Sequence, residues 1–423
     1  MKKLVLALLL VSTAAAYAQH GLDKDISQIE SKVIEWRRDF HQYPELSNRE
    51  FKTAEKIAAH LKSLGLEVQT GIAHTGVVGL LKGDNPGKVL ALRADIDALP
   101  VPERADLPFK SVAKGEFRGE EVPVMHACGH DTHIAILMGV AEIMANNKDK
   151  INGTIKFIFQ PAEEGAPPGE EGGAKMMVEE GVLKNPDVDA IFGLHIGSGQ
   201  PVNTLAYRSG GIMAAVNSFE INVTGKQTHG SRPWGGVDPI MASVKIIDGL
   251  QTLVSREMPL TQEAVVLSIG KIKSGLRSNI IPESAQIIGT LRTLDTGMQA
   301  RMHERMREMV PAIAKAYRAE ATIDIDEGYP ITYNDPELTA QMLPSLKKAA
   351  GDDKVFEIKA ITGAEDFSFF QKEVPGLYFF LGGMAPGETE AFPHHTPDFY
   401  IDESGLLLGV KTFVQMSLDY LNN

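Results

Sequence analysis

Cysteine is nearly missing from this sequence, because the chain of 423 residues contains one, Cys128. A single thiol cannot close a disulfide within the chain, so a packed core has to hold the fold. The hydrophobic fraction of 43% allows such a core, and the length suits two or three domains. A basic excess is missing as well, since the formal net charge is −13. That balance argues against nucleic acid or an anionic membrane as partner, although a local Arg can still bind the carboxylate of a small substrate.

Apolar runs that could span a bilayer, which takes about 20 residues, are also missing. The N-terminus has a shorter one: Met1-Lys2-Lys3 is followed by the apolar run Leu4–Val11 and by a small-residue stretch ending at Ala18. A basic start, a short apolar segment and an Ala-x-Ala end are typical of a secretory signal peptide. We expect residues 1–18 to be cleaved off. The mature protein would then be exported, periplasmic or secreted, with no stable membrane insertion.

The chain outside this segment alternates between helix and strand patterns. Apolar residues at helical spacing predict helix over residues 26–65. Strand-like runs are Val77–Leu81, Val89–Leu92, Thr154–Phe159, Ala190–Leu194 and Leu377–Leu381; helical runs are Ile134–Ala145, Ala174–Leu183, Glu337–Ala350 and Leu406–Leu421. Such alternation predicts an α/β fold with a mostly parallel sheet.

A different pattern begins near residue 212. Ser218–Val223 alternates apolar and polar residues, as in a sheet with one exposed face. Two predicted helices and three more strands follow, at Pro239–Ser255, Ala264–Ile272, Ala285–Leu291, Met298–Arg318 and Ala321–Ile325. We predict a smaller, ferredoxin-like α+β domain at 212–326, inserted into a catalytic domain made of 22–211 and 327–423.

The densest group of reactive side chains lies between Met125 and His133. Three of the 12 histidines and the only cysteine fall within these few residues, and Cys128 and His130 are two apart. Thiolate and imidazole are common ligands of zinc-like divalent ions. The alternative from this cluster alone is a redox or structural thiol with incidental histidines.

Further donors follow the predicted strands. Glu163-Glu164 comes after Thr154–Phe159, His195 after Ala190–Leu194, and Asp97 after Val89–Leu92, while His394-His395 precedes the last helix. Open parallel sheets bind their ligands at the carboxyl ends of strands. One of two adjacent carboxylates can bind a metal while the other serves as general base. Together these residues supply the thiolate, imidazole and carboxylate groups of a two-metal site.

A Cys–His nucleophilic triad of Cys128, His130 and Asp97 is the competing enzymatic hypothesis. It is disfavoured because an imidazole two residues from the thiol on one loop rarely faces it, and because the paired glutamates would have no role. Neither a Walker motif nor a dinucleotide-binding fingerprint occurs in the sequence.

These motifs, in this order, resemble the amidohydrolase branch of the aminoacylase–carboxypeptidase superfamily, which includes hippurate hydrolases and plant indole-acetyl-amino-acid hydrolases. The resemblance runs from about Arg37 to Glu403. It rests on these motifs: Arg37–His41, Leu92–Pro100, Met125–Asp131, Gln160–Gly165, Gly225–His229, Gly363–Phe367 and His395-Thr396-Pro397. The sequence departs from the family pattern at Pro233-Trp234 and in a longer, more acidic loop at Ala166–Gly172.

The resemblance implies a di-metal catalytic domain and an inserted domain that forms a homodimer. It implies five metal ligands: Cys128, His130, Glu164, His195 and His395, with Cys128 between two divalent ions (zinc, manganese, cobalt or nickel). Glu163 would be the general base and Asp97 would orient a ligand histidine. From the inserted domain His229 would polarise the scissile carbonyl, and Asn279 and Arg292 would contact substrate.

The implied activity is metal-dependent hydrolysis of N-acyl amino acids to a carboxylic acid and a free amino acid. A dipeptidase or carboxypeptidase with the same site is the alternative enzyme. A metal-dependent binding protein without turnover is the alternative of another class, and Glu163 argues against it because a binder needs no base.

Overall fold

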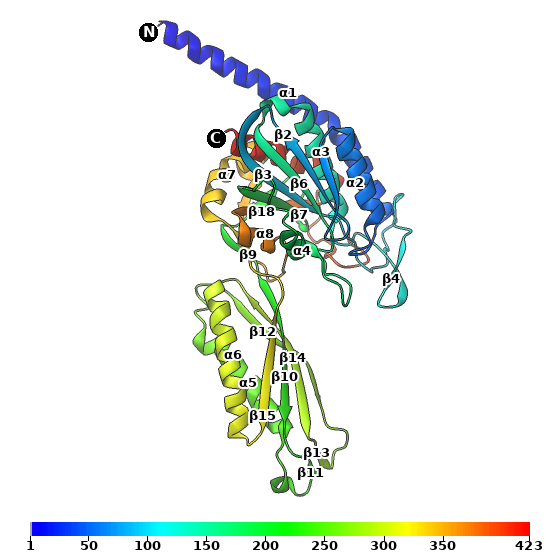
Figure 1. The fold of residues 1–423 in the computed structure, drawn as a ribbon, viewed down its shortest axis with the longest axis vertical. Coiled ribbons are helices and arrows are strands. Elements are labelled where there is room, and N and C mark those ends of the chain that lie inside the picture. Colours follow the sequence, from blue (N-terminus) through cyan, green and yellow to red (C-terminus); the bar gives the residue numbers. More distant parts are fainter. Residues whose placement is uncertain (1) are drawn as a thin grey trace. The chain divides into compact units, whose positions relative to one another are not determined.

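The computed structural model describes the backbone of residues 2–423 and the side chains of residues 22–423. The chain divides into two compact units (Figure 1). The first comprises Met1–Ser209, Asn334–Ile358 and Phe369–Asn423, and the second comprises Gly210–Tyr333 and Lys359–Ser368. The predicted signal peptide, residues 1–18, lies outside the residues whose side chains are described. Within the described part of the chain, none of the helices combines the length and the apolar character that crossing a bilayer requires.

The second unit takes in more of the chain than the predicted 212–326. It extends to Tyr333 and includes Lys359–Ser368, which the sequence had placed in the catalytic domain. The reason is long-range pairing: Ala214 N donates to the backbone oxygens of Ile361 (3.2 Å) and Gly363 (2.9 Å). The returning segment thus pairs with the segment that leads into the unit, a contact that no local sequence pattern reveals.

An eight-stranded sheet forms the centre of the first unit, in the order β1-β2-β6-β3-β7-β18-β8-β17. Its strands are β1 (Glu67–Ile72), β2 (Gly76–Lys82), β3 (Asn85–Asp95), β6 (Asn152–Gln160), β7 (Ala190–Pro201), β8 (Leu205–Tyr207), β17 (Val355–Glu357) and β18 (Gly376–Met384). The four central strands β6, β3, β7 and β18 are parallel, whereas β1, β2 and β8 introduce antiparallel pairs. The predicted mostly parallel sheet is therefore confirmed.

Helices cover this sheet (Figure 1). They are α1 (Lys2–Gln42), α2 (Phe51–Ser63), α3 (His130–Asn146), α4 (Gly173–Glu179), α7 (Pro336–Ala350), α8 (Ser368–Glu373) and α9 (Leu406–Leu421). Helices α3 and α9 pack on β3 and on each other, with α1 and α7 beside them. Their buried side chains and the central strands form one continuous core. A hairpin of β4 (Lys114–Phe117) and β5 (Glu120–Pro123) stands apart from the large sheet.

Three predicted element limits were wrong. The helix predicted over 26–65 is two helices, because Pro44 disfavours helical geometry at Tyr43 and Asn48 has a φ of 58°. The helix predicted to reach Leu183 ends at Glu179, where Gly181 follows with a φ of 82°. Strand β7 continues past Leu194 to Pro201, so His195 lies within the strand.

The second unit has a four-stranded antiparallel sheet with the order β12-β14-β10-β15. Its elements are β10 (Ala215–Thr224), β12 (Val265–Ser274), β14 (Ser284–Thr293), β15 (Glu320–Glu327), α5 (Pro239–Thr252) and α6 (Thr296–Ala316). Both helices pack on the sheet and on each other over a separate core (Figure 1). Short pairs join β11 (Thr228–His229) to β13 (Ile280–Ile281) and β9 (Gly210–Met213) to β16 (Thr332–Asn334). The α+β pattern of alternating burial along β10 is as predicted.

Candidate metal centre

The register of the central strands β3, β6 and β7 determines which candidate residues lie side by side at the end of the sheet. Asp95 at the end of β3 pairs with Gln160 at the end of β6, and Arg93 pairs with Gly193 of β7. Two residues further along, Asp95 and His195 therefore lie at the same level. The segments that carry Asp97 and Glu163 follow directly after their strands. The candidate donors thus converge at the carboxyl edge of the sheet, as the strand pattern predicted.

Cys128 lies at the centre of this group, in the turn that leads into α3. Gly129 makes the turn with a φ of 92° and is followed by His130, the first residue of the helix. A Cβ on Gly129 would lie 2.3 Å from Cγ2 of Ile196. Only glycine fits here, for reasons of both backbone conformation and space.

Two histidines from distant parts of the chain face the thiol. Nε2 of His195 lies 3.4 Å from Sγ of Cys128, and Nε2 of His395 lies 3.3 Å from the same sulfur. The loop that carries His395 is held because its backbone N donates to the oxygen of Ala127 at 2.9 Å. The Nδ1 of His195 hydrogen-bonds the oxygen of Ile196 at 2.7 Å, which leaves Nε2 to face the site.

His394 also lies near the thiol, with Nδ1 3.6 Å from Sγ of Cys128. Both of its ring nitrogens already have backbone partners: Nε2 accepts from Ser198 N at 3.2 Å, and Nδ1 lies 3.2 Å from the oxygen of Cys128. Its neighbour His395 directs Nε2 at the thiol and at Oε1 of Glu164, 2.9 Å away. This difference supports the preference for His395 as the ligand.

Asp97 contacts two candidate ligands, His130 and Glu164. Its backbone oxygen and its Oδ1 lie 2.9 Å and 3.2 Å from Nδ1 of His130. Its Oδ2 accepts from Ser47 Oγ at 2.8 Å and from the backbone N of Glu164 at 3.0 Å. The ring of His130 is thereby oriented with Nε2 toward the site, and that buried nitrogen makes no hydrogen bond.

The adjacent glutamates point to different neighbours. Glu164 pairs with His395, whereas Oε2 of the buried Glu163 lies 3.8 Å from Nε2 of His130. Cys128, His130 and Glu164 offer atoms within 4.8 Å of one another, and so do Cys128, His195 and His394. Since both ring nitrogens of His394 have backbone partners, the ligand candidates beside the first group are His195 and His395, whose Nε2 atoms lie 3.4 Å and 3.3 Å from the same thiol. One thiol is therefore close to all the other candidate ligands, as a ligand shared by two ions requires.

The electrostatics fit a cation at this place. Burial raises the pKa of the Cys128 thiol well above its usual value, and the negative charges of Glu164 and Glu163 add to that rise. Burial opposes a charged His130, yet Asp95 and Asp97 outweigh burial and raise its pKa to about 10. The pocket therefore favours positive charge at His130 Nε2. Burial lowers the pKa of His195 well below its usual value, which keeps its imidazole neutral and able to bind a metal.

The structure adds supporting residues that the sequence pattern did not single out. His133 joins Asp95 (2.6 Å) to the backbone N of Ile196 (2.8 Å), next to His195. Glu50 accepts hydrogen bonds from Ala162 N at 3.0 Å and from Thr75 Oγ1 at 2.6 Å. Ala162 directly precedes the glutamate pair, so Glu50 helps to hold that segment in place. Neither Ser47 nor Glu50 carries a recognisable signal, because each is an isolated polar residue far from the site in sequence.

The predicted residues of the second unit lie at two separate places in it. His229 is exposed, and its Nδ1 accepts from Ser231 N at 3.0 Å. Asn279 is close to it, since Gly230 N donates to the oxygen of Asn279 at 2.7 Å. Arg292 lies near the other end of β14, roughly 25 Å along the strand. Within one chain, Arg292 and His229 therefore do not meet, and their substrate-binding roles stay predictions.

The sequence and the fold match those of known proteins. The profile of the peptidase family M20/M25/M40 matches residues 91–419. The chain belongs to this family. Family membership makes it a hydrolase that acts on amide bonds, and it confirms the predicted resemblance and the predicted class of enzyme.

Two relatives and one solved structure show the range of this family. The "Thermostable carboxypeptidase 2" of Saccharolobus solfataricus is 42% identical over 95% of this chain and 98% of its own length. An "N-acetylcysteine deacetylase" of Bacillus subtilis is 37% identical over 92% of this chain and 96% of its own. A Bacillus subtilis structure described as a dinuclear metal binding peptidase is 33% identical, with a TM-score of 0.78 over 94% of this chain and 99% of its own.

Proposed function

We propose that this protein is a metal-dependent amidohydrolase that cleaves N-acyl amino acids into a carboxylic acid and a free amino acid. One observation carries the proposal: a buried carboxylate, Glu163, lies 3.8 Å from the unbonded Nε2 of His130, while the adjacent Glu164 pairs with His395. The two glutamates thus have different neighbours, which allows one to hold a cation and the other to carry a proton. The donor set of one thiol, three imidazoles and a carboxylate suits zinc, manganese, cobalt or nickel.

Five residues would hold the two ions: Cys128, His130, Glu164, His195 and His395. Ions bound by such donors lower the pKa of water and polarise a carbonyl. Glu163 takes a proton from the attacking water as the new C–O bond forms, and it returns a proton to the nitrogen as the C–N bond breaks. Asp97 keeps the ring of His130 in the tautomer that presents Nε2.

The second unit would complete the site. Because His229 and Arg292 do not meet within one chain, we propose a homodimer in which one subunit supplies His229 and the other supplies Arg292 to the same site. His229 stabilises the oxygen of the scissile carbonyl, the guanidinium of Arg292 pairs with the substrate carboxylate, and Asn279 also contacts substrate. Exposed apolar residues of α5 (Ile240, Met241 and Val244, 40–48% exposed) support a homodimer formed through this unit. The molar mass from light scattering, in wild type and in Met241→Lys, tests this assembly.

The alternative is a carboxypeptidase or dipeptidase, which the carboxypeptidase of Saccharolobus supports. The deacetylase of Bacillus supports the N-acyl amino acid instead. The deciding experiment compares N-acetyl and N-benzoyl amino acids with dipeptides and longer peptides, after chelation and after single metals are added back. Activity that chelation abolishes and metal restores, with kcat/KM highest on acyl amino acids, supports the proposal. Higher kcat/KM on peptides contradicts it.

A further inference from the structure

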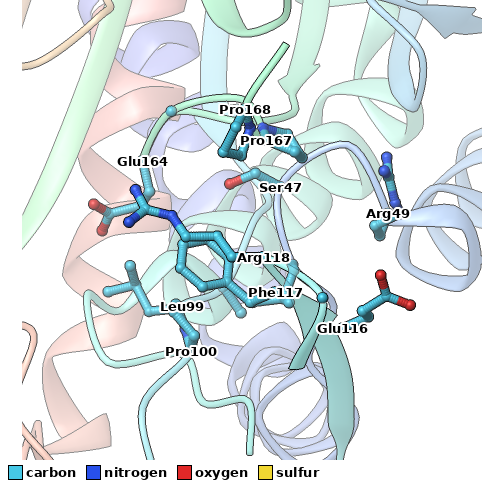
Figure 2. A pocket seen from close by; sticks show the side chains of 14 residues that line it. Ser47, Arg49, Leu99, Pro100, Glu116, Phe117, Arg118, Glu164, Pro167 and Pro168 are labelled. Carbon is cyan, nitrogen blue, oxygen red and sulfur yellow. The ribbon is translucent and has the colours of Figure 1, made fainter. Parts of the chain in front are cut away.

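A cavity of about 490 Å³ adjoins Glu164 in the first unit. That volume falls in the ~300–1,000 Å³ range of small-molecule sites. Figure 2 shows side chains from the hairpin, from the segment around Ser47 and from the segment after Glu164 surrounding it. Much of its wall is apolar, contributed by Leu46, Leu99, Pro100, Phe117, Pro167 and Pro168. The cavity therefore provides space for an apolar part of a substrate next to a candidate metal ligand.

The hairpin β4–β5 forms one wall and is packed against the body of the unit. Leu46, Ala98 and Val124 form a small apolar cluster that partly buries Phe117. The approach is close at Gly115, where a Cβ would lie 2.9 Å from Cδ1 of Leu46. This wall is therefore formed before any substrate binds.

The acidic loop after Glu164 forms the opposite wall and is fastened as well. Arg49 binds both oxygens of Glu170 at 2.6 Å and 3.0 Å, and Asn48 donates to Glu170 at 3.1 Å and to the oxygen of Glu171 at 3.0 Å. The positive charge of Arg49 is therefore paired with Glu170 within this wall. These contacts hold Pro167 and Pro168 against the cavity.

Arg118 sits at the tip of the hairpin in a conformation that costs an arginine free energy. Its φ is 55° and that of Gly119 is 82°, a two-residue turn for which asparagine followed by glycine is the favoured sequence. The guanidinium carbon lies 5.1 Å from the centre of the Phe117 ring. Figure 2 shows the guanidinium turned to the side of the cavity that carries Glu164. A planar cation at this place can stack on a second aromatic ring.

The position of the cavity decides which half of the substrate enters it. The leaving nitrogen has to lie near Glu163, which returns a proton to it in the proposed reaction. The acyl half extends from the other side of the scissile carbonyl carbon. Glu164 lines the cavity and Glu163 does not, which favours the acyl half over the leaving amine as the part of the substrate that enters it. The carboxylates of Glu116 and Glu164 in its wall disfavour an anionic acyl group.

We propose that this cavity binds an uncharged aromatic acyl group and that Arg118 stacks on its ring, which makes Arg118 a specificity-determining residue. The inference rests on the proposed amidohydrolase function. It also assigns a role to the acidic loop at Ala166–Gly172, as a wall of the acyl pocket.

The first test measures kcat/KM for N-benzoyl and N-acetyl derivatives of one amino acid. Arg118→Asn suits the turn better than arginine, so the variant keeps the hairpin and removes the guanidinium. We expect the benzoyl-to-acetyl ratio to fall roughly threefold to fivefold, as loss of a half-exposed cation–π contact predicts. Arg118→Lys should retain part of the ratio. Lys114→Asn, which removes a charge from the same hairpin outside the cavity, should leave the ratio unchanged.

The second test needs no turnover: the uncharged probes benzamide and acetamide are titrated into metal-free wild type and Arg118→Asn by calorimetry. Benzamide should bind wild type more tightly than the variant by the same factor. If wild type cleaves no acyl amino acid, the proposed function fails, while this titration still decides the pocket. An unchanged benzoyl-to-acetyl ratio in Arg118→Asn overturns the inference. The inference is also overturned if Arg118→Asn changes kcat/KM only among N-acetyl derivatives of different amino acids.

Discussion

The carboxylate of Asp97 contacts the ring of His130, with Oδ1 3.2 Å from Nδ1. Its other oxygen accepts from the backbone N of Glu164 at 3.0 Å. Asp97 therefore sets the orientation of one candidate metal ligand and the position of a second, although it lies two residues beyond the end of β3. Several expectations depend on this support.

Asp97→Asn should weaken metal binding without unfolding the protein. The amide keeps the size of the side chain but loses the charge that stabilises the His130 ring, so we expect zinc or cobalt affinity to fall about 10–100-fold. Titration against a chromophoric chelator measures the change. Ser47→Ala removes only the hydroxyl donor to Oδ2 of Asp97 and should lower the metal affinity less than Asp97→Asn does. Equal affinities in wild type and Asp97→Asn would contradict the orienting role.

Glu163→Gln should retain two metals per chain and lose turnover. The loss of the proton carrier should lower kcat by roughly 10²–10⁴-fold. Metal content by elemental analysis and kcat on one acyl amino acid are measured on the same sample. Glu171→Gln, an exposed change in the following loop, is the matched control. Substantial turnover in Glu163→Gln would rule out this residue as the base.

Gly129→Ala should be far more damaging than an ordinary glycine substitution. The added Cβ meets Ile196 at 2.3 Å, in addition to the cost of a φ of 92°. Gly181→Ala is the control, because its φ is 82° and nothing lies within 4 Å of the added Cβ. Conformation alone should cost the control about 1–2 kcal/mol, and the clash should add about 1–3 kcal/mol at Gly129. Denaturant unfolding of both variants measures the difference, and equal losses would exclude a clash.

Glu50 should make the stability of the metal-free protein fall as the pH rises. Burial, with the nearby charge of Asp97, raises the pKa of Glu50 from 4.5 to about 8. Between these values the folded state binds more protons than the unfolded state, so its contribution is full below pH 4.5 and is lost toward pH 8. Glu50→Gln removes this titration. Unfolding free energies measured from pH 5 to 9 should decline less in the variant; parallel curves would show that Glu50 does not titrate there.

Export predicts a defined N-terminus. Cleavage after Ala18 leaves Gln19 first, and intact-mass spectrometry of the protein from a periplasmic or secreted fraction detects it. Ala18→Asp breaks the Ala-x-Ala signal and should leave residues 1–18 attached. A wild-type protein that retains Met1 in that fraction would contradict the signal peptide.

Much of the site was predictable because its donors are chemically unusual and follow strands. Asp97, Glu163 and His195 each stand at or near the carboxyl end of a buried β-rich run, and parallel strands end at one edge. Cys128 instead directly precedes a helix. The strand limits themselves were less predictable. His195 proved to lie inside β7, since pairing with β18 extends that strand beyond its apolar run.

Other features depend on contacts between residues distant in sequence. The resemblance favoured His395 over His394 through the motif His395-Thr396-Pro397, but only the structure gives a physical reason, because His394 hydrogen-bonds to Ser198 and Cys128. The second unit acquires Lys359–Ser368 through pairing with Ala214. Arg118 becomes relevant because a two-residue turn places it against a cavity beside Glu164.

The sequence by itself determined the types of donor, the order of strands and helices and the break near residue 212, because side-chain chemistry and apolar periodicity act over a few neighbouring residues. The tertiary structure alone decided which nitrogen faces the thiol, which polar residues hold the ligands and where a cavity remains. Those outcomes depend on the register of the sheet and on hydrogen bonds between segments far apart in the chain, and both are set only when the whole fold has formed.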